Sequence, residues 1–428
     1  MMKVFDNPAV ETWPELTMRP VMNLKDLFPL VQSVFESIRE KGDNAIIDYT
    51  NQFDKVKLAD FKVTQEEIIE VESLVSEELK TAIQKSFDNI YKFHNALKEQ
   101  AKEIETTPGV RCWRESRPIE KVGIYIPGGS APLFSTVLML GIPALIAGCR
   151  EVVVCTPPDR FGKIHPAILF ASQLVGATSV YKIGGIQAIG AMAIGTKSVP
   201  RVSKIFGPGN QYVMAAKQVA QQYGVAIDMP AGPSEVMVIA DDAAIAEFVA
   251  ADLLSQAEHG VDSQVMLITT SEKLSKEAGH ALKRQLNRLP GKEVAEKALE
   301  NSPIILFHRI EDCIAFSNAY APEHLILAVD NPRALVKEVI NAGSVFLGNY
   351  SCESAGDYAS GTNHTLPTNG YAKMYSGVSV DSFIKKITFQ ELSAEGVKSL
   401  GKIVETMAEA EGLQAHKEAM TLRLNFIK

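Results

Sequence analysis

The fold class is decided by residues 122–155, which read VGIYIPGGSAPLFSTVLMLGIPALIAGCREVVVC. A short apolar run, Val122–Ile126, leads through a glycine-rich turn into a long helix pattern over Ala131–Ala147, and a second apolar run, Val152–Cys155, follows. Apolar strands that alternate with helices and turn residues are typical of parallel sheets covered by helices. The stretch therefore predicts one strand–helix–strand unit of an α/β fold.

The same alternation continues through most of the chain, with helix patterns such as Gln211–Tyr223, Ala243–Glu258 and Ser271–Asn287 between the apolar runs. The predicted strands are Val122–Ile126, Val152–Cys155, Ser179–Ile183, Lys204–Phe206 and Val225–Asp228, and then Val236–Ala240, Gln264–Thr269, Ile304–Phe307, Leu325–Ala328 and Val345–Leu347. These two groups of five strands predict an α/β protein with two related doubly wound, Rossmann-like parallel-sheet domains. The boundary between them is expected near Gly232–Ser234.

Both ends of the chain are expected to be helical. Thr64-Gln-Glu-Glu67 forms a capping box at the start of one helix pattern, and a longer helix pattern begins near Ser76. The last helix pattern, Leu392–Gly412, is polar enough to form an arm that lies on another surface. The predicted organisation is a mainly helical N-terminal segment packing on the core (1–119), a first α/β unit (120–234), a second α/β unit (235–378) and a helical C-terminal arm (379–428).

Composition excludes several classes of protein. The chain has 428 residues and a net charge of -8 without a basic cluster, which argues against nucleic acid as a partner. The N-terminus has no apolar signal region, and the longest apolar runs are shorter than the ~20 residues that span a bilayer. The five cysteines are odd in number and form no CxxC motif. We therefore expect a reduced, cytoplasmic protein with no membrane partner.

Three glycine-rich turns are predicted at the carboxyl ends of strands in the first unit: Pro127-Gly-Gly-Ser130, Gly184-Gly185 and Gly207-Pro-Gly-Asn210. Glycine lets the backbone approach a phosphate, and the following helix offers free N–H groups. None of the turns has the G-x-G-x-x-G pattern of dinucleotide-binding folds, and ordinary turn chemistry explains any one of them alone. Three such turns in one unit favour a ligand crevice.

The C-terminal half concentrates residues that can bind metals and transfer protons. The chain holds eight histidines, and four of them fall in the following short pieces. These pieces are Gln256-Ala-Glu-His259, Pro322-Glu-His324, Gly356-Asp-Tyr358 with Asn363-His364, and Glu411 with His416. Two neutral imidazoles, a carboxylate and an amide oxygen would form a mixed site suited to zinc. The adjacent glutamate and histidine would supply a base beside it.

Each piece also has a simpler structural interpretation. Gln256 and His259 share a helix face and can point at one ion, or Gln256 is solvated and His259 stabilises the helix C-terminus. Glu323 and His324 are adjacent in an extended segment, so both reach one ligand only if Pro322 bends the chain. Otherwise they are an exposed charge beside an ordinary histidine.

The remaining pieces lie in a long polar loop and in the C-terminal arm. Asp357 is a candidate ligand and His364 a candidate substrate contact, and surface decoration is the alternative for both. Glu411 and His416 flank a glycine at a helix end and, taken alone, fit a solvated tail.

No cysteine is assigned to catalysis. Cys149 and Cys155 bracket a predicted buried strand and are expected in the core. Cys112, Cys313 and Cys352 have no obvious base partner that would generate a reactive thiolate.

Taken together, these segments closely resemble the histidinol dehydrogenase family, in the expected order and over nearly the whole chain. The matching segments are Gly123–Pro132, Ile183–Ile189, Gly207–Val213, Asp228–Glu235, Leu253–Gly260, Ala321–His324, Gly356–His364 and Glu411–His416. The stretch before Thr107 is less distinctive.

The resemblance implies oxidation of L-histidinol through L-histidinal to L-histidine, with reduction of two NAD⁺, as the last steps of histidine biosynthesis. It implies one zinc ion per site, held by Gln256, His259, Asp357 and His416. It implies NAD contacts from Tyr125, Gln187 and Asn210. It implies substrate contacts from Ser234, Gln256, His259, His324, Asp357, Glu411 and His416. It further implies that Glu323 and His324 are the acid/base pair, and that a homodimer exchanges its C-terminal arms.

The residue types suit this chemistry. A neutral imidazole can remove the hydroxyl proton as hydride leaves the alcohol. Oxidation of the aldehyde requires that water add first, and Glu323 can activate that water without a cysteine.

Two other functions are alternatives. A zinc hydrolase that uses Glu323 as its base would leave the glycine turns unused. A non-catalytic zinc-stabilised scaffold would need a closed site without a nearby base.

Overall fold

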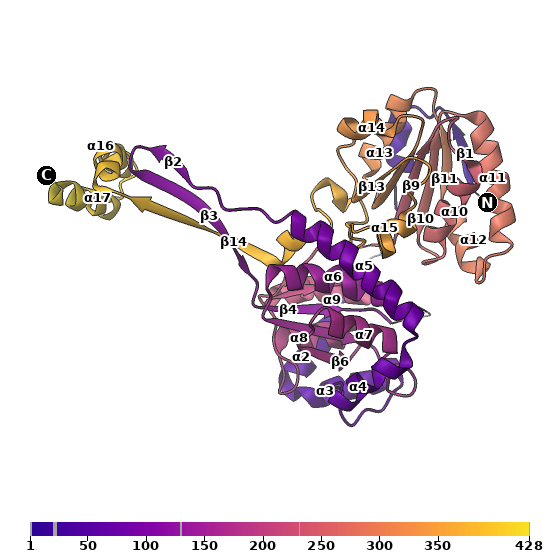
Figure 1. The fold of residues 1–428 in the computed structure, drawn as a ribbon, viewed down its shortest axis with the longest axis horizontal. Coiled ribbons are helices and arrows are strands. Elements are labelled where there is room, and N and C mark those ends of the chain that lie inside the picture. The colour runs from indigo at the N-terminus through magenta and orange to yellow at the C-terminus, as the bar shows by residue number, and fades with distance from the viewer. Residues whose placement is uncertain (1, 20–23, 129–130, 231, 428) are drawn as a thin grey trace.

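The computed structural model describes residues 2–19, 24–128, 131–230 and 232–427. Two α/β units lie side by side, and a long arm carries the C-terminus away from both (Figure 1). In the described ranges no helix combines the length and the apolar character needed to cross a membrane.

The first unit is built on a parallel sheet whose described strands have the order β6-β5-β4-β7-β8. These strands are β4 (Lys121–Tyr125), β5 (Glu151–Thr156), β6 (Ser179–Lys182), β7 (Lys204–Phe206) and β8 (Ala226–Ile227). The chain starts at β4, winds outward to β6 and then returns to β7 on the other side. This is the doubly wound order, which confirms the predicted fold class and puts a switch point between β4 and β7.

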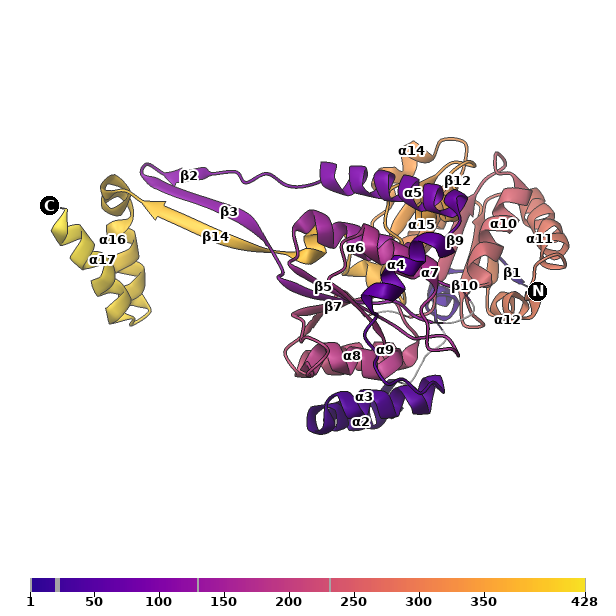
Figure 2. The same cartoon turned by 60° about the horizontal axis from the view of Figure 1, so that its bottom comes forward.

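Helices cover both faces of this sheet because successive strand residues alternate between two apolar clusters. Val122 and Ile124 pack on one side, and Val153 and Cys155 of the neighbouring strand pack on the other. On the first side lie α4 (Gln65–Leu74), α5 (Glu77–Ala96), α6 (Phe134–Ala147) and α7 (Pro166–Leu174). On the second side lie α2 (Phe28–Lys41), α3 (Asp43–Tyr49), α8 (Gly185–Ile194) and α9 (Gln211–Gln222). Figure 2 shows α2 and α3 beneath α8.

The second unit repeats this winding in a sheet with the order β1-β11-β10-β9-β12-β13. Its strands are β1 (Lys3–Asp6), β9 (Glu235–Ala240), β10 (Gln264–Thr269), β11 (Pro303–Leu306), β12 (His324–Ala328) and β13 (Ser344–Leu347). Its helices are α10 (Ala246–Ala257), α11 (Glu272–Leu286) and α12 (Lys292–Glu300) on one face, and α1 (Trp13–Leu16), α13 (Ile310–Tyr320) and α14 (Pro332–Leu335) on the other. The short helix α15 (Glu353–Tyr358) follows β13. The five predicted strands are confirmed, and β1 is an unpredicted addition that pairs in parallel with β11.

The arm differs from the prediction of a purely helical C-terminus. It begins as an antiparallel ladder of β2 (Ile104–Thr107), β3 (Val110–Pro118) and β14 (Ile384–Leu392), and ends in α16 (Ala394–Ala410) and α17 (Gln414–Phe426). The strands were missed because most ladder residues are at least partly exposed, so burial imposes no clear alternation on them. Pairing between segments more than 260 residues apart supplies the strand conformation instead. The domain boundaries near residues 120, 235 and 379 remain predictions.

Candidate active site

A cavity of about 830 Å³ opens at the carboxyl ends of the first unit's strands. Tyr125, Gln187 and Asn210, the three predicted NAD contacts, all line it, together with Gly128 of the first glycine turn. Gly129 and Ser130 of that turn lie outside the described residues. The structure therefore brings the three side chains together at the switch point, and their contact with NAD remains a prediction.

The cavity also contains a carboxylate that the sequence did not indicate. Gln187 is fully buried, its Nε2 donates to Asp54 Oδ2 at 3.1 Å, and its Oε1 has no partner among the described residues. Burial raises the pKa of Asp54 to about 6. Nearby, the Tyr125 hydroxyl accepts a hydrogen bond from the Gly185 N–H at 3.1 Å. The segment 1–119 was expected to be a scaffold, yet Asp54 belongs to it.

A buried ion pair holds the turn that begins at Gly207. Lys217 and Asp228 form a salt bridge, Lys217 Nζ donates to Gly207 O at 2.9 Å, and the Gly207 N–H donates to Asp228 at 2.8 Å. Gly207 has φ +131°, and a Cβ there would lie 2.1 Å from the carbonyl oxygen of Tyr125. Asn210 caps α9, because its Oδ1 accepts from the N–H groups of the next turn.

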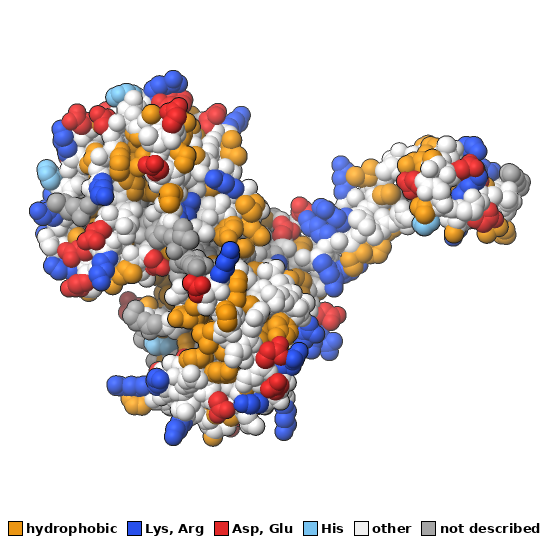
Figure 3. Space-filling view, turned by 180° about the vertical axis from the view of Figure 1, so that it is seen from behind, with side chains coloured by type: hydrophobic (Ala, Val, Ile, Leu, Met, Phe, Trp, Pro, Cys, Tyr) orange, Lys and Arg blue, Asp and Glu red, His pale blue; other side chains and the backbone are white. Residues whose placement is uncertain are grey.

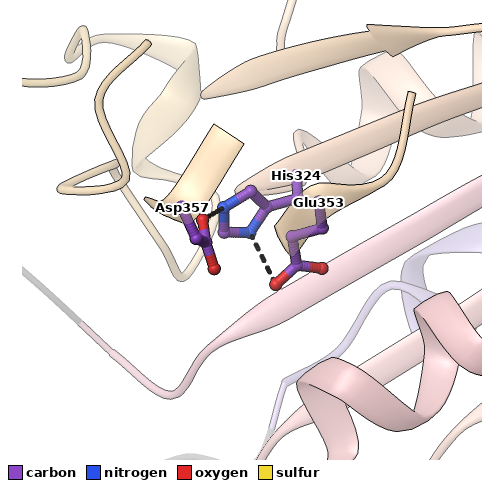
Figure 4. Close-up of side chains that lie close together, drawn as sticks. All are labelled: His324, Glu353 and Asp357. Atoms are coloured by element: carbon purple, nitrogen blue, oxygen red, sulfur yellow. Dashed lines mark ion pairs between the residues drawn. The ribbon is translucent and has the colours of Figure 1, made fainter. Parts of the chain in front are cut away.

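A second polar cluster is centred on His324, the first residue of β12. Its ring lies between two carboxylates of α15, with Nε2 3.5 Å from Asp357 and Nδ1 3.9 Å from Glu353 (Figure 4). Nδ1 is also 3.7 Å from Glu323. All three carboxylates and the imidazole lie within one region at the amino end of β12.

The chain bends just before this cluster, as the sequence required. Ala321 adopts a left-handed conformation with φ 59°, which is uncommon for a residue other than glycine. Pro322 follows, and the side chains of Glu323 and His324 then approach each other instead of pointing apart. Both are buried, which excludes the alternative of an exposed charge beside a surface histidine.

Burial controls the acidity of the glutamates. Desolvation raises the pKa values of Glu323 and Glu353 to about 8 each. Glu323 accepts a hydrogen bond from the Glu235 N–H at 2.8 Å. The amide of Gln256 lies between the two glutamates and can donate to Glu323 or, turned over, to Glu353.

His324 is surrounded by negative charge. Burial works to lower its pKa, but the carboxylates of Glu353, Glu323 and Asp357 outweigh it and raise the pKa to about 10. Its Nε2 makes no hydrogen bond within the described ranges, because the 3.5 Å separation from Asp357 is long.

Three of the four predicted metal ligands lie around this cluster. Gln256 contacts Glu323, while His259 and Asp357 are close enough that the charge of each shifts the other's pKa. Burial works to raise the pKa of Asp357, but His324, His364 and His259 lower it overall. Desolvation lowers the pKa of His259.

The long polar loop supports Asp357 as well. His364 Nδ1 lies 3.0 Å from the Asp357 carbonyl oxygen, and its Nε2 lies 3.2 Å from the Thr136 hydroxyl of α6 in the first unit. The loop therefore connects the cluster to the other unit. Ser234, a predicted substrate contact, is half-buried and directly precedes Glu235.

Glu411 and His416 lie elsewhere in the chain. They sit in the exposed turn and helix at the far end of the arm, away from α15 (Figures 1 and 2). Seen from behind, the arm stands clear of both units and exposes hydrophobic side chains beside charged ones (Figure 3). A single chain thus does not bring the predicted fourth ligand, His416, to the other three.

The compact metal-like group in the structure differs from the predicted set. His324, Glu353 and Asp357 offer ligand atoms within 4.8 Å of one another, and only Asp357 is common to both sets. Glu353 Oε2 and His324 Nε2 lack hydrogen-bond partners in the described part of the chain. Buried nitrogen and oxygen ligand atoms without hydrogen-bond partners, with His259 and Gln256 beside them, suit a divalent cation. Glu353 was missed because its spacing from Asp357 on a short helix gave no recognisable motif.

Two of the thiols, those of Cys149 and Cys155, are unsuited to nucleophilic catalysis. Cys155 is fully buried in β5 and Cys149 is half-buried, and burial raises the pKa values of both thiols, that of Cys149 to about 11. Both are therefore poor nucleophiles, as their expected core positions imply.

Comparison with known proteins agrees with this geometry. The family model described as histidinol dehydrogenase matches residues 17–424. A histidinol dehydrogenase of Bacteroides thetaiotaomicron is 59% identical over 428 residues and covers 100% of both chains. One from Vibrio vulnificus is 54% identical over 396 residues, covering 92% of this chain and 91% of its own.

A solved structure extends the match to three dimensions. The crystal structure of histidinol dehydrogenase from Elizabethkingia anophelis superposes with a TM-score of 0.98 at 59% identity, covering 100% of this chain and 98% of that one. On the sequence, the family model and the fold together, this chain belongs to the histidinol dehydrogenase family.

Proposed function

We propose that the protein is a zinc- and NAD-dependent L-histidinol dehydrogenase that oxidises L-histidinol to L-histidine through L-histidinal, reducing two NAD⁺. The observation that carries the proposal is the buried Glu323–His324 pair beside Asp357, in a chain of this family. His324 can serve the alcohol step and Glu323 the aldehyde step. The glycine-turn cavity of the neighbouring unit can bind the dinucleotide.

In the alcohol step, His324 takes the hydroxyl proton as hydride leaves the carbinol carbon. The three carboxylates that raise its pKa stabilise the imidazolium that forms. Neutralisation of Asp357 by a cationic ligand would lower that pKa towards the range in which imidazole accepts a proton. Because Glu323 and His324 are both buried, bulk water is excluded from the proton transfer to His324.

In the aldehyde step, Glu323 activates the water that adds to the carbonyl carbon. A carboxylate with a pKa of about 8 is a stronger base than an ordinary glutamate once it is ionised, and it titrates near neutral pH. The hydrogen bond from the Glu235 N–H holds one of its oxygens, so the other can face the water.

The cofactors would occupy sites made by the residues already described. Gln256, His259 and Asp357 of one chain, with His416 of a second, would hold zinc, and the ion would serve to orient the substrate through its amine and imidazole. NAD, the hydride acceptor, would bind along Tyr125, Gln187 and Asn210. Glu411 of the arm and Ser234 of the chain that supplies the other three zinc ligands would both contact the substrate.

We further propose a homodimer with exchanged arms, which the distant position of His416 supports. Exposed apolar side chains on the arm support such docking, among them Met407, Leu422 and Phe426, which is 91% exposed. Docking these side chains on a second chain would bury them and bring His416 to the partner's site.

The proposal is tested by incubating the zinc-loaded protein with L-histidinol and NAD⁺ and following NADH absorbance. We expect two NADH per histidinol consumed, with histidine as the product. Metal removal should abolish the reaction and added zinc should restore it. A protein that forms no NADH from either histidinol or histidinal would disprove the proposal, and hydrolysis of an ester substrate would point to a hydrolase instead.

A further inference from the structure

Arg19, from the N-terminal segment, is buried against the second unit. Its guanidinium makes a two-point contact with Glu235, with Nε 2.5 Å from Oε1 and Nη2 3.0 Å from Oε2. The two side chains are only 12% and 2% exposed. A planar fork matched to a carboxylate in this way fixes both position and orientation.

The same guanidinium also holds the turn before the catalytic pair. It stacks on the ring of Tyr320 at 3.8 Å, and Nη2 donates to the carbonyl oxygens of Tyr320 at 2.9 Å and Ala321 at 3.3 Å. Ala321 is the residue whose left-handed backbone makes the bend. Such a conformation persists when the surrounding contacts define it, and Arg19 supplies two of them.

Glu235, which Arg19 holds in place, contacts both Glu323 and His324 through its backbone. Its N–H donates to Glu323 at 2.8 Å, and its carbonyl oxygen lies 3.2 Å from His324 Nδ1. Its carboxylate is further fixed by the Asn369 N–H at 2.8 Å. Arg19 therefore binds both β9 and the turn that leads into β12. The distance between these two segments determines the position of Glu323.

We infer that Arg19 is a positioning residue that aims the Glu323 carboxylate at the attacking water. The inference rests on the proposed function. His324 is paired with both neighbouring strands, β13 and β9. Glu323 precedes β12, and among the described residues its backbone is held by β13 alone, through the Ser344 N–H, which donates to its carbonyl oxygen at 2.9 Å. Because the Glu323 backbone lacks this pairing with β9, loss of Arg19 should disturb Glu323 more. A residue that only supported the fold would affect both oxidation steps alike.

The test compares Arg19→Met and Arg19→Lys with wild-type protein, using histidinal to isolate the aldehyde step and pre-steady-state NADH formation from histidinol to measure the alcohol step. A misplacement of about 1 Å can cost roughly 10²-fold in rate. We therefore expect Arg19→Met to lower kcat for histidinal by up to about that factor, with KM for NAD unchanged and a much smaller effect on the alcohol step. Arg19→Lys, which keeps the charge but loses the fork, should fall between the two.

Arg309→Met is the matched control, because Arg309 also pairs with a glutamate in the second unit but is 67% exposed. It should leave both steps unchanged. If Arg19→Met does not fold, Arg19→Met with Glu235→Gln removes the unpaired buried charge and is judged by the same ratio of rates. Equal losses in both steps, or none, would overturn the inference while the wild-type activity upholds the proposed function. A wild-type protein without activity would overturn both.

Discussion

The side chains of Glu323 and His324 approach each other because a single left-handed residue, Ala321, turns the chain before them. The carboxylate and the imidazole then lie 3.7 Å apart in a buried region, each with a pKa that its surroundings have raised. If the two residues serve different oxidation steps, as proposed, single substitutions should affect the two steps differently.

Glu323→Gln should impair the aldehyde step far more than the alcohol step, because only the aldehyde requires an activated water. Loss of general-base assistance should cost roughly 10²–10⁴-fold. Rates with histidinal measure the second step directly. Equal losses with both substrates would show that Glu323 serves both steps or neither.

His259→Ala and Asp357→Ala should each lose zinc and activity but keep the fold, because neither side chain belongs to the four apolar clusters. Atomic absorption gives the metal content and circular dichroism the fold. His280→Ala, in α11, is the control for loss of a histidine and should keep its zinc. A His259 or Asp357 variant with stoichiometric zinc would show that its residue is not a ligand.

At this scale the sequence indicated residues that sit beside turn signals, such as Glu323 after Pro322. It did not indicate Glu353, Asp54 or Arg19. Each of these is an ordinary charged residue in its local sequence, and becomes distinctive only when chain segments far away bury it.

The helices and strands differ in how well the local sequence predicts them. Ten of the eleven described strands in the two parallel sheets were predicted, since burial on both faces leaves continuous apolar runs. The strands β1, β2, β3 and β14 were not, because three form an exposed ladder and the fourth is an edge strand of four residues. These strands form because they pair with distant segments, and the local sequence carries no pattern that predicts this pairing.

The β7–α9 connection leads to a prediction about the Lys217–Asp228 pair. Lys217→Met should leave Asp228 buried without a counter-ion, which costs about 3–5 kcal/mol of folding free energy. The turn at Gly207 should loosen and weaken NAD binding. Denaturant unfolding and calorimetric titration with NAD measure the two effects.

Lys121→Met provides the comparison, because the Lys121–Glu151 pair lies in the same unit but is 43% and 32% exposed. It should cost about 1 kcal/mol or less and leave NAD affinity unchanged. If Lys217→Met lowers stability but binds NAD normally, the ion pair does not shape the turn.

In the whole molecule, the arm separates His416 from the remaining predicted ligands (Figure 1). A site completed by a second chain makes a specific prediction. His259→Ala and His416→Ala homodimers should each be inactive, but a hybrid dimer has one site with both lesions and one with none. Random mixing should therefore restore up to about a quarter of wild-type activity.

A mixture of His259→Ala and Asp357→Ala is the control, because both lesions lie in the body of the chain and every hybrid site keeps one of them. It should stay inactive. If the first mixture is also inactive although mass spectrometry detects hybrid dimers, all ligands come from one chain and the arm has another role.

The pairing of β1 with β11 has a consequence for the nascent chain. Lys3 pairs with Pro303, so β1 has no partner strand until some three hundred residues have followed it. At translation rates of about 5–20 residues per second, that strand waits roughly 15–60 s. Most of the first unit, between α2 and β8, can form during this interval, although Val378, Val380 and Phe383 join its core only later. The order of synthesis therefore favours assembling the sheet of the first unit before that of the second.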